Sequence, residues 1–205
     1  MKAMHIDDVL DRAHVVSLPL AVRFRGITTR EALLIEGPAG WGEFAPFLEY
    51  GPAESAAWLR AGLEAAYEGF PEPVRDSIEV NATIPAVPAS EVPAVVERYP
   101  GCRTFKIKVA EKGHTLADDA TRVRAVRDAV TQRGDIPILR VDANGGWTVD
   151  EAVEAAQMMM PLDYMEQPCA TTEELAQVRG RLMRAGLFVR VAADESIRKV
   201  ADPYR

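Results

Sequence analysis

Three acidic residues close three successive apolar segments in the second half of the chain: Asp142, Glu166 and Asp194. The first two are 24 positions apart and the last two 28, about one strand-plus-helix unit each time. Each acid alone also fits an ordinary solvated loop. If the segments are parallel strands, however, their carboxyl ends share one rim, and carboxylates gathered there need a cation. Oxygen ligands suit Mg²⁺, so the series predicts a Mg²⁺ site.

Two lysines, Lys106 and Lys108, are two positions apart in the preceding apolar segment. A strand alternates its side chains, so both ammonium groups are expected on one face, with Phe105, Ile107 and Val109 on the other. In a barrel that shared face can be the interior. On an exposed edge strand they would be ordinary solvated residues. Their position one strand before the first of the acids favours the interior.

Strands and helices must alternate for these residues to meet, and the pattern after residue 77 does alternate. Strands are predicted at residues 78–84, 104–109, 136–142, 162–166 and 187–194, with amphipathic helices in the gaps. Capping boxes Thr148-x-x-Glu151 and Thr171-x-x-Glu174 mark two helix starts. The alternation implies an α/β fold with parallel strands, wound into a barrel or an open doubly wound sheet. No glycine-rich phosphate loop follows the first strand, which favours the barrel.

The first part of the chain has a different pattern. Strands of an antiparallel meander and a following helix are expected at residues 13–20, 27–36, 41–44 and 53–70. Pro71 ends the helical pattern. We therefore predict two domains, an α+β domain over residues 1–77 and an incomplete β/α barrel of about five strands over residues 78–205.

Composition narrows the class of protein. The chain has 24 basic and 31 acidic residues, a net charge of −7, and no basic stripe, so a nucleic-acid partner is not expected. No apolar run approaches the roughly 20 residues that cross a bilayer, so no membrane association is expected. Cys102 and Cys169 are far apart, and no charged-then-apolar leader precedes them. A cytoplasmic location is the expectation, without a disulfide framework.

Four short motifs follow one another on the predicted strands: Lys106-x-Lys108, Asp142-Ala143-Asn144, Glu166-Gln167-Pro168 and Asp194-Glu195-Ser196. This order resembles the enolase superfamily, in its muconate-lactonising-type branch. The N-terminal part is similar to the capping domain of o-succinylbenzoate synthases, through Arg23-Phe24-Arg25-Gly26-Ile27-Thr28, Arg30-Glu31 and the run from Trp41 to Phe47. The resemblance covers nearly the whole chain, and it implies an enolase-type cap followed by part of a TIM-type barrel.

The resemblance also implies a role for each site residue. Asp142, Glu166 and Asp194 would bind Mg²⁺, with Lys108 as the general base and Lys106 as its strand partner in the site. Arg140, on the same strand face as the first ligand, would contact a substrate carboxylate. Asn144 and Glu195 would orient the metal ligands.

The function implied is Mg²⁺-dependent dehydration of 2-succinyl-6-hydroxy-2,4-cyclohexadiene-1-carboxylate to 2-succinylbenzoate, in menaquinone biosynthesis. The partner would be this small carboxylate substrate, and the sequence predicts no particular oligomeric state. One alternative is an N-succinylamino-acid racemase or dipeptide epimerase of the same superfamily, which needs lysines on both faces of its substrate. Another is an inactive or purely interacting fragment.

The length departs from the resemblance. A complete barrel of this type has eight strands and about 250 residues, whereas 128 residues follow residue 77 here. The lysine that the family carries on the next strand has no counterpart in this sequence. The expectation is therefore a fragment of a longer enzyme that lacks full activity on its own.

Overall fold

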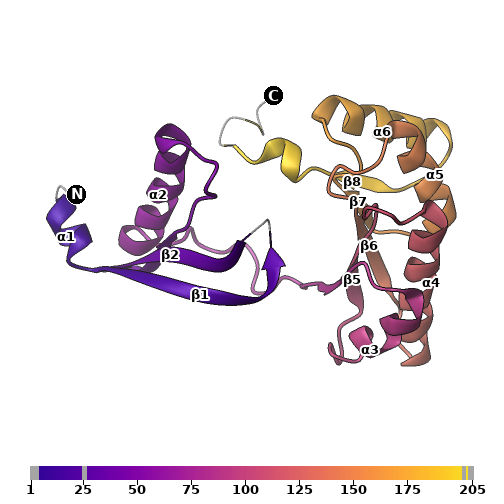
Figure 1. Cartoon of the computed structure of the whole chain (residues 1–205), viewed down its shortest axis with the longest axis horizontal. Coiled ribbons are helices and arrows are strands. Elements are labelled where there is room, and N and C mark those ends of the chain that lie inside the picture. The colour runs from indigo at the N-terminus through magenta and orange to yellow at the C-terminus, as the bar shows by residue number, and fades with distance from the viewer. Residues whose placement is uncertain (1–4, 25–26, 200–201, 203–205) are drawn as a thin grey trace. The chain divides into compact units, whose positions relative to one another are not determined.

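The structure is a computed structural model that describes residues 5–24, 27–199 and 202. The chain divides into two compact units, Met1–Asp76 and Ser77–Arg205 (Figure 1). Arg25 and Gly26, which belong to the capping-domain motif, lie outside the described residues. In the ranges that the structure describes, no helix is long and apolar enough to cross a membrane.

The first unit contains a three-stranded antiparallel sheet and two helices. Its elements are α1 (Ile6–Leu10), β1 (Ala13–Phe24), β2 (Ile27–Gly37), β3 (Gly40–Phe44) and α2 (Pro52–Tyr67). β2 pairs with β1 on one side and with β3 on the other, which confirms the predicted meander. α2 ends before Phe70, the predicted end, because Gly69 has a φ of 84° and its amide closes the last turn on the Glu64 carbonyl. Phe70 is exposed as a result.

α2 lies directly on β3, because glycines let the two backbones approach. A Cβ on Gly42 would lie 1.8 Å from the carbonyl oxygen of Gly62, and no side-chain rotation relieves a clash with backbone. We expect Gly42→Ala to lower the free energy of unfolding of this unit by about 2 kcal/mol. Urea unfolding in a Trp147→Phe background measures it, through the fluorescence of Trp41 and Trp58.

The matched control is Gly51→Ala, at the start of α2. A Cβ on Gly51 would meet no heavy atom within 4 Å, and the residue has a φ of −73°, which alanine adopts readily. This variant is expected to lose less than about 1 kcal/mol. If the two variants lost equal free energy of unfolding, the close approach of α2 to β3 would not be what requires glycine at position 42.

The second unit is built on a five-stranded parallel sheet. Its strands, in their spatial order, are β4 (Ala82–Ile84), β5 (Thr104–Lys108), β6 (Ile138–Asp142), β7 (Tyr164–Glu166) and β8 (Arg190–Ala192). The predicted parallel arrangement is confirmed. Lys108, Asp142, Glu166 and Ala192 form one row of the register across β5 to β8. Two of the predicted ligands therefore end neighbouring strands at the same level.

The strands begin later than the sequence predicts. β4 starts four residues after residue 78, and β6 starts two residues after residue 136. The apolar side chains of Ile78, Val80 and Ile136 are exposed, so they precede the sheet and do not extend it. Hydrophobicity marks where a strand lies, but which residues pair depends on the neighbouring strand.

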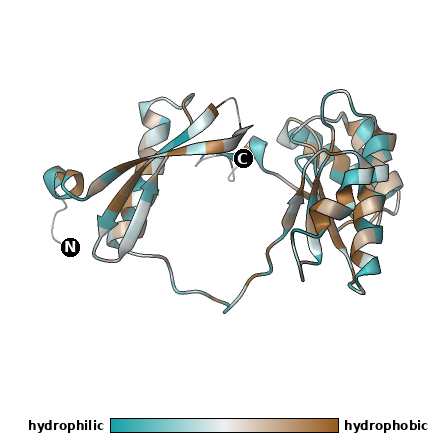
Figure 2. Ribbon diagram, turned by 60° about the horizontal axis from the view of Figure 1, so that its bottom comes forward, coloured by the Kyte–Doolittle hydropathy of each residue, from teal (hydrophilic) through white to brown (hydrophobic). Residues whose placement is uncertain are grey.

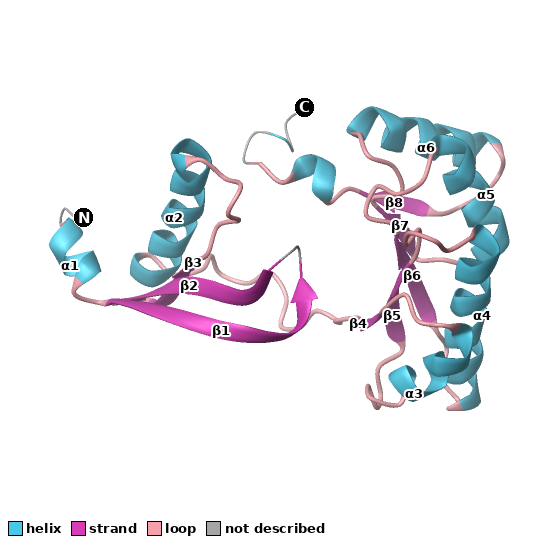
Figure 3. Cartoon of the chain, in the orientation of Figure 1, coloured by secondary structure: helices cyan, strands magenta, loops and turns pink. Residues whose placement is uncertain are grey.

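Helices connect the strands of this unit. They are α3 (Val92–Val96), α4 (Leu116–Gln132), α5 (Val149–Met159) and α6 (Thr172–Arg184), with 3₁₀ turns η1 (Ala89–Glu91) and η2 (Glu195–Ile197). α4, α5 and α6 lie on the same side of the sheet (Figure 3). Both predicted capping boxes are present, at Thr148 and Thr171. A third box starts α4, where Asp118 takes the place of the usual glutamate and pairs with Thr115.

The core of this unit fills the space between the sheet and these helices (Figure 2). The strands contribute the buried side chains of Phe105, Ile107, Val141 and Met165. The helices contribute the buried residues Ala120, Val123, Val126, Val130, Ala152 and Ala156. Since side chains alternate along a strand, the polar residues of β5 and β6 lie on the opposite face of the sheet.

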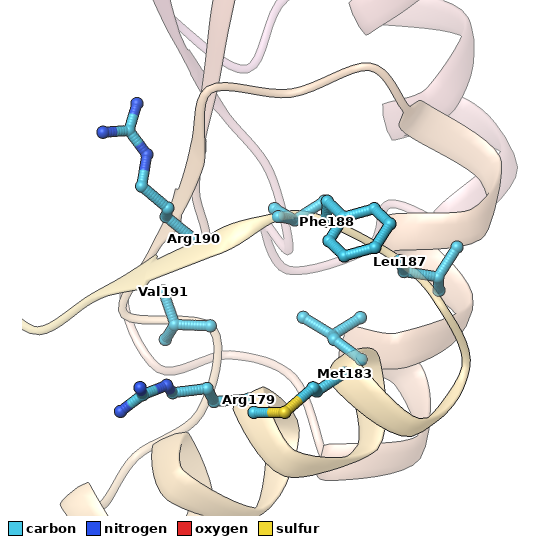
Figure 4. Close-up of a pocket in the computed structure, with 8 residues that line it drawn as sticks. Arg179, Met183, Leu187, Phe188, Arg190 and Val191 are labelled. Carbon is cyan, nitrogen blue, oxygen red and sulfur yellow. The ribbon is translucent and has the colours of Figure 1, made fainter.

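A pocket of about 510 Å³ lies beside β8, at one edge of the sheet (Figure 4). It is lined by residues from α6, from the segment leading into β8 and from β8 itself, among them Met183, Leu187 and Val191. β8 pairs with β7 and, within the described residues, with no second strand. Met183 and Phe188 are exposed here, so this edge of the sheet is apolar and open.

Candidate active site

β5 carries two lysines on the face that turns away from the core. Phe105 and Ile107 are fully buried, whereas the side chains of Lys106 and Lys108 are 21% and 32% exposed. This alternation of buried and exposed side chains follows from the strand geometry of β5, which ends at Lys108. Both ammonium groups therefore lie on one face, near the carboxyl end of the strand.

Asp142, the last residue of β6, lies against both lysines. Its carboxylate is 1% exposed, and its Oδ2 lies 2.6 Å from Lys108 Nζ and 3.1 Å from Lys106 Nζ. Burial would raise the pKa of Asp142, but the hydrogen bond and charge of Lys108, with those of Lys106, outweigh burial and hold the pKa below its ordinary value. Asp142 is therefore a carboxylate at neutral pH.

Lys106 joins two of the acidic residues. Its Nζ lies 2.7 Å from Glu166 Oε1 as well as within reach of Asp142. Burial would lower the pKa of Lys106, but the hydrogen bond with Glu166 and the charges of both acids outweigh burial and raise it. Lys106 consequently stays an ammonium ion, and it brings the ends of β6 and β7 together.

Asn144 extends this cluster toward β8. Its Oδ1 accepts a hydrogen bond from Lys108 Nζ at 2.8 Å, and its Nδ2 donates one to Glu195 Oε1 at 2.8 Å. Its own amide donates to Asp142 Oδ1 at 3.1 Å, in a turn where Asn144 has a φ of 46°. The structure thus joins Glu166, Asp142 and Glu195 through the two lysines and Asn144.

Asp194 stands apart from the other two predicted ligands. It lies two residues beyond Ala192, which continues the register row on β8, and it is exposed. Among the described residues, no three acidic, histidine or cysteine side chains are placed closely enough to hold a metal ion. The three-carboxylate centre therefore stays a prediction.

Gln167 braces the segment that carries Asp194, and sequence reasoning assigned it no role. It is fully buried, and its Oε1 accepts from the Asp194 amide at 2.7 Å and from the Ser196 hydroxyl at 3.1 Å. Its Nε2 donates to the Cys169 carbonyl at 2.8 Å. A glutamine directly after a predicted ligand and before Pro168 was the available signal. Gln167 links the ends of β7 and β8.

We expect Gln167→Leu to lower the free energy of unfolding of the second unit by about 2 kcal/mol, because leucine leaves the buried Cys169 carbonyl without its donor and removes the acceptor of the Asp194 amide. Gln157→Leu, on the exposed side of α5, is the control and is expected to change it by less than about 0.5 kcal/mol. Urea unfolding followed by far-UV circular dichroism compares the two. If Gln167→Leu lowered the free energy of unfolding no more than Gln157→Leu, the Gln167 hydrogen bonds would not stabilise this segment.

Arg140 lies on the same strand face as Asp142, but the structure does not bring its guanidinium to the cluster. Its Nε donates to Asp163 Oδ2 at 2.9 Å and its Nη1 to Asn81 Oδ1 at 2.8 Å. The guanidinium also lies 4.8 Å from the centre of the Tyr164 ring. Asp163 and Asn81 precede their strands, so Arg140 is held toward the amino end of the sheet, away from the expected substrate.

The cluster combines two kinds of chemistry. The carboxylates of Asp142 and Glu166 approach one cation, the Lys106 ammonium, so their oxygens are already arranged around a positive charge. An all-oxygen donor set of this kind fits Mg²⁺. Lys108 places a second amine beside Asp142, where it can exchange a proton with a bound molecule.

Known proteins share much of this sequence. The chain is 58% identical over 203 residues to an o-succinylbenzoate synthase of Mycolicibacterium smegmatis, a match that covers 98% of this chain and 60% of that protein. A synthase of Mycobacterium leprae is 57% identical over 201 residues, with 97% and 57% covered. The chain thus spans about 60% of the length of the curated relatives that it matches.

Solved structures agree at the level of the fold. A mandelate racemase/muconate lactonizing protein from Herpetosiphon aurantiacus has a TM-score of 0.66 at 25% identity, covering 94% of this chain and 69% of that one. An o-succinylbenzoate synthase from Thermosynechococcus elongatus, complexed with Mg in the active site, has a TM-score of 0.60 at 21% identity, covering 90% and 68%.

Family models match both parts of the chain. The model described as enolase N-terminal domain-like matches residues 15–66. The model described as enolase C-terminal domain-like matches residues 89–204, which is more than half of the chain and includes every lysine and acid of the cluster. The chain therefore belongs to the enolase superfamily, through its enolase C-terminal domain-like family.

Proposed function

We propose that this chain carries the general base and the metal ligands of an o-succinylbenzoate synthase. The reaction removes a proton next to a carboxylate of 2-succinyl-6-hydroxy-2,4-cyclohexadiene-1-carboxylate. The ring hydroxyl group then takes up a proton and leaves as water, which makes the ring aromatic. The observation that carries the proposal is the contact of Lys108 with Asp142 and Asn144 at the carboxyl end of the sheet. The 58% identity to the Mycolicibacterium smegmatis synthase supports the choice of substrate.

Each residue of the cluster has a role in this proposal. Lys108 accepts the proton, and Lys106 stays charged beside it and holds Glu166 in place. Asn144 orients the Lys108 amine by accepting one of its hydrogen bonds.

Asp142, Glu166 and Asp194 would hold Mg²⁺, since all three offer only carboxylate oxygens and Asp142 and Glu166 already converge on one cation. When bound, Mg²⁺ would supply Lewis-acid stabilisation of the charge that develops on the substrate carboxylate. The ligand role of Asp194 rests on its place two residues after β8 and on the hydrogen bond by which Gln167 fixes its backbone.

The test uses a chimera, in which residues 1–205 are joined to the part of the Mycolicibacterium smegmatis relative that the match leaves uncovered. With Mg²⁺ and the cyclohexadiene substrate, the chimera is expected to form the aromatic product, followed by its ultraviolet absorbance. An L-Ala-L-Glu dipeptide is offered in parallel. Epimerisation of the dipeptide without dehydration would support the epimerase alternative, and a folded, Mg²⁺-binding chimera with neither activity would contradict the proposal.

A further inference from the structure

A buried ion pair on α4 lies behind β5. Arg122 Nη1 is 2.6 Å from Asp119 Oδ1, and the two side chains are 2% and 1% exposed. Fully buried charges are rare, and an ion pair in a core often adds no stability over apolar residues of similar size. Stability alone therefore does not explain why this ion pair is present, and its hydrogen bonds to other segments indicate another role.

Arg122 reaches the backbone of the proposed base. Its Nη1 donates to the carbonyl oxygen of Lys108 at 3.1 Å, and its Nε donates to the Val87 carbonyl at 2.6 Å. Its Nη2 contacts His114 Nδ1 at 2.8 Å, across the loop that follows β5. One planar guanidinium thus ties β5, the segment after β4 and this loop to α4.

Asp119 bonds the same loop at Ala110, two residues after Lys108. Its Oδ2 accepts a hydrogen bond from the amide of Ala110 at 2.8 Å. Ala110 has a φ of 58°, so the chain turns sharply as soon as it has passed Lys108 and Val109. The Val109 amide, in between, donates to the Asp142 carbonyl at 3.1 Å. The end of β5 is therefore fixed on both sides of Val109, by α4 and by β6.

We infer that Asp119 and Arg122 are positioning residues, which fix the backbone at Lys108 and Ala110 so that the Lys108 amine meets Asp142 and Asn144. This inference rests on the proposed function only in taking Lys108 as the base. Neither residue touches the acids of the cluster, and both act through the strand end. The sequence held one signal for them, a charged pair three residues apart on the helix that carries the buried stripe Ala120, Val123 and Val126.

Two variants separate positioning from a general effect on the fold. Arg122→Lys keeps a cation beside Asp119, but a single ammonium cannot also reproduce the guanidinium bonds to Lys108 and Val87. Asp119→Leu/Arg122→Met removes both charges and leaves neither one buried alone. The readout is the ¹⁵N–¹H cross peak of each lysine ammonium in the 205-residue chain, with Lys106 as an internal reference because neither residue of the pair touches it.

We expect both variants to retain the Lys106 cross peak and to lose or shift that of Lys108. In the chimera, kcat for dehydration should fall by about 10²-fold with KM little changed, because the base is misplaced and not removed. An unchanged Lys108 cross peak in folded variants would overturn the inference, and so would the failure of both variants to fold. An inactive parent chimera would instead count against the proposed function, and the cross peaks would still decide the inference.

Discussion

Replacing Lys108 with methionine in the chimera is expected to lower kcat for dehydration by about 10²–10⁴-fold, the usual contribution of a general base. Methionine fills a similar volume, and Asp142 keeps its contact with Lys106, so the fold is expected to survive. Initial rates of product formation at saturating substrate and Mg²⁺ measure the effect. The loss should appear in kcat more than in KM, because the amine accepts the proton in the transition state and contributes less to substrate binding.

Lys112→Met is the control for this substitution, since Lys112 is exposed in the loop after β5. It is expected to change kcat less than twofold, because it makes no contact with the cluster that the described residues record. If Lys108→Met retains most of the parent activity, the amine of Lys108 is not the base.

Asp142→Asn is expected to lower the free energy of unfolding of the second unit by about 3 kcal/mol in the absence of Mg²⁺, the lower end for breaking a buried ion pair. The lower end applies because Lys106 and Lys108 keep partners in Glu166 and Asn144 and are partly exposed. Urea unfolding followed by circular dichroism gives the value. Asp128→Asn, exposed on α4, is the control and should change it by less than about 0.5 kcal/mol.

The pH dependence of this loss has a definite sign. The pKa of Asp142 is lower in the folded chain than its ordinary value, so its contribution is present above the pKa of an unfolded aspartate, about 3.9. The contribution is lost as the pH falls through the lower folded pKa. The gap between the parent and Asp142→Asn should therefore be full at pH 7 and narrow below about pH 4. A gap that stays constant down to pH 2 would contradict the ion pair.

The alternation of short apolar segments with capped helices was sufficient to predict the parallel sheet. Period-two alternation placed Lys106 and Lys108 on one face, and the spacing of the acids placed Asp142 and Glu166 at neighbouring strand ends. Each of these predictions depends on local periodicity, which a single sequence contains. The late starts of β4 and β6 were missed, because pairing is decided by a partner strand and not by the apolar letters themselves.

Contacts between distant segments could not be predicted in the same way. Arg140 is predicted to contact the substrate, whereas its guanidinium bonds Asp163 and Asn81, which lie just before β7 and β4 at the amino end of the sheet. Gln167 and Arg122 were overlooked because their bonds are made to backbone groups far along the chain. A buried polar side chain shows its purpose only when its partners in space are known.

The Mg²⁺ site is tested by titrating the 205-residue chain with Mg²⁺ and following the amide resonances of Asp142, Glu166 and Asp194. We predict saturable shifts at all three positions with one dissociation constant. Asp142→Asn and Asp194→Asn should each weaken binding at least tenfold, and Asp128→Asn should leave it unaffected. Shifts that do not saturate, or that Asp142→Asn leaves unchanged, would contradict a Mg²⁺ site at the ends of β6, β7 and β8.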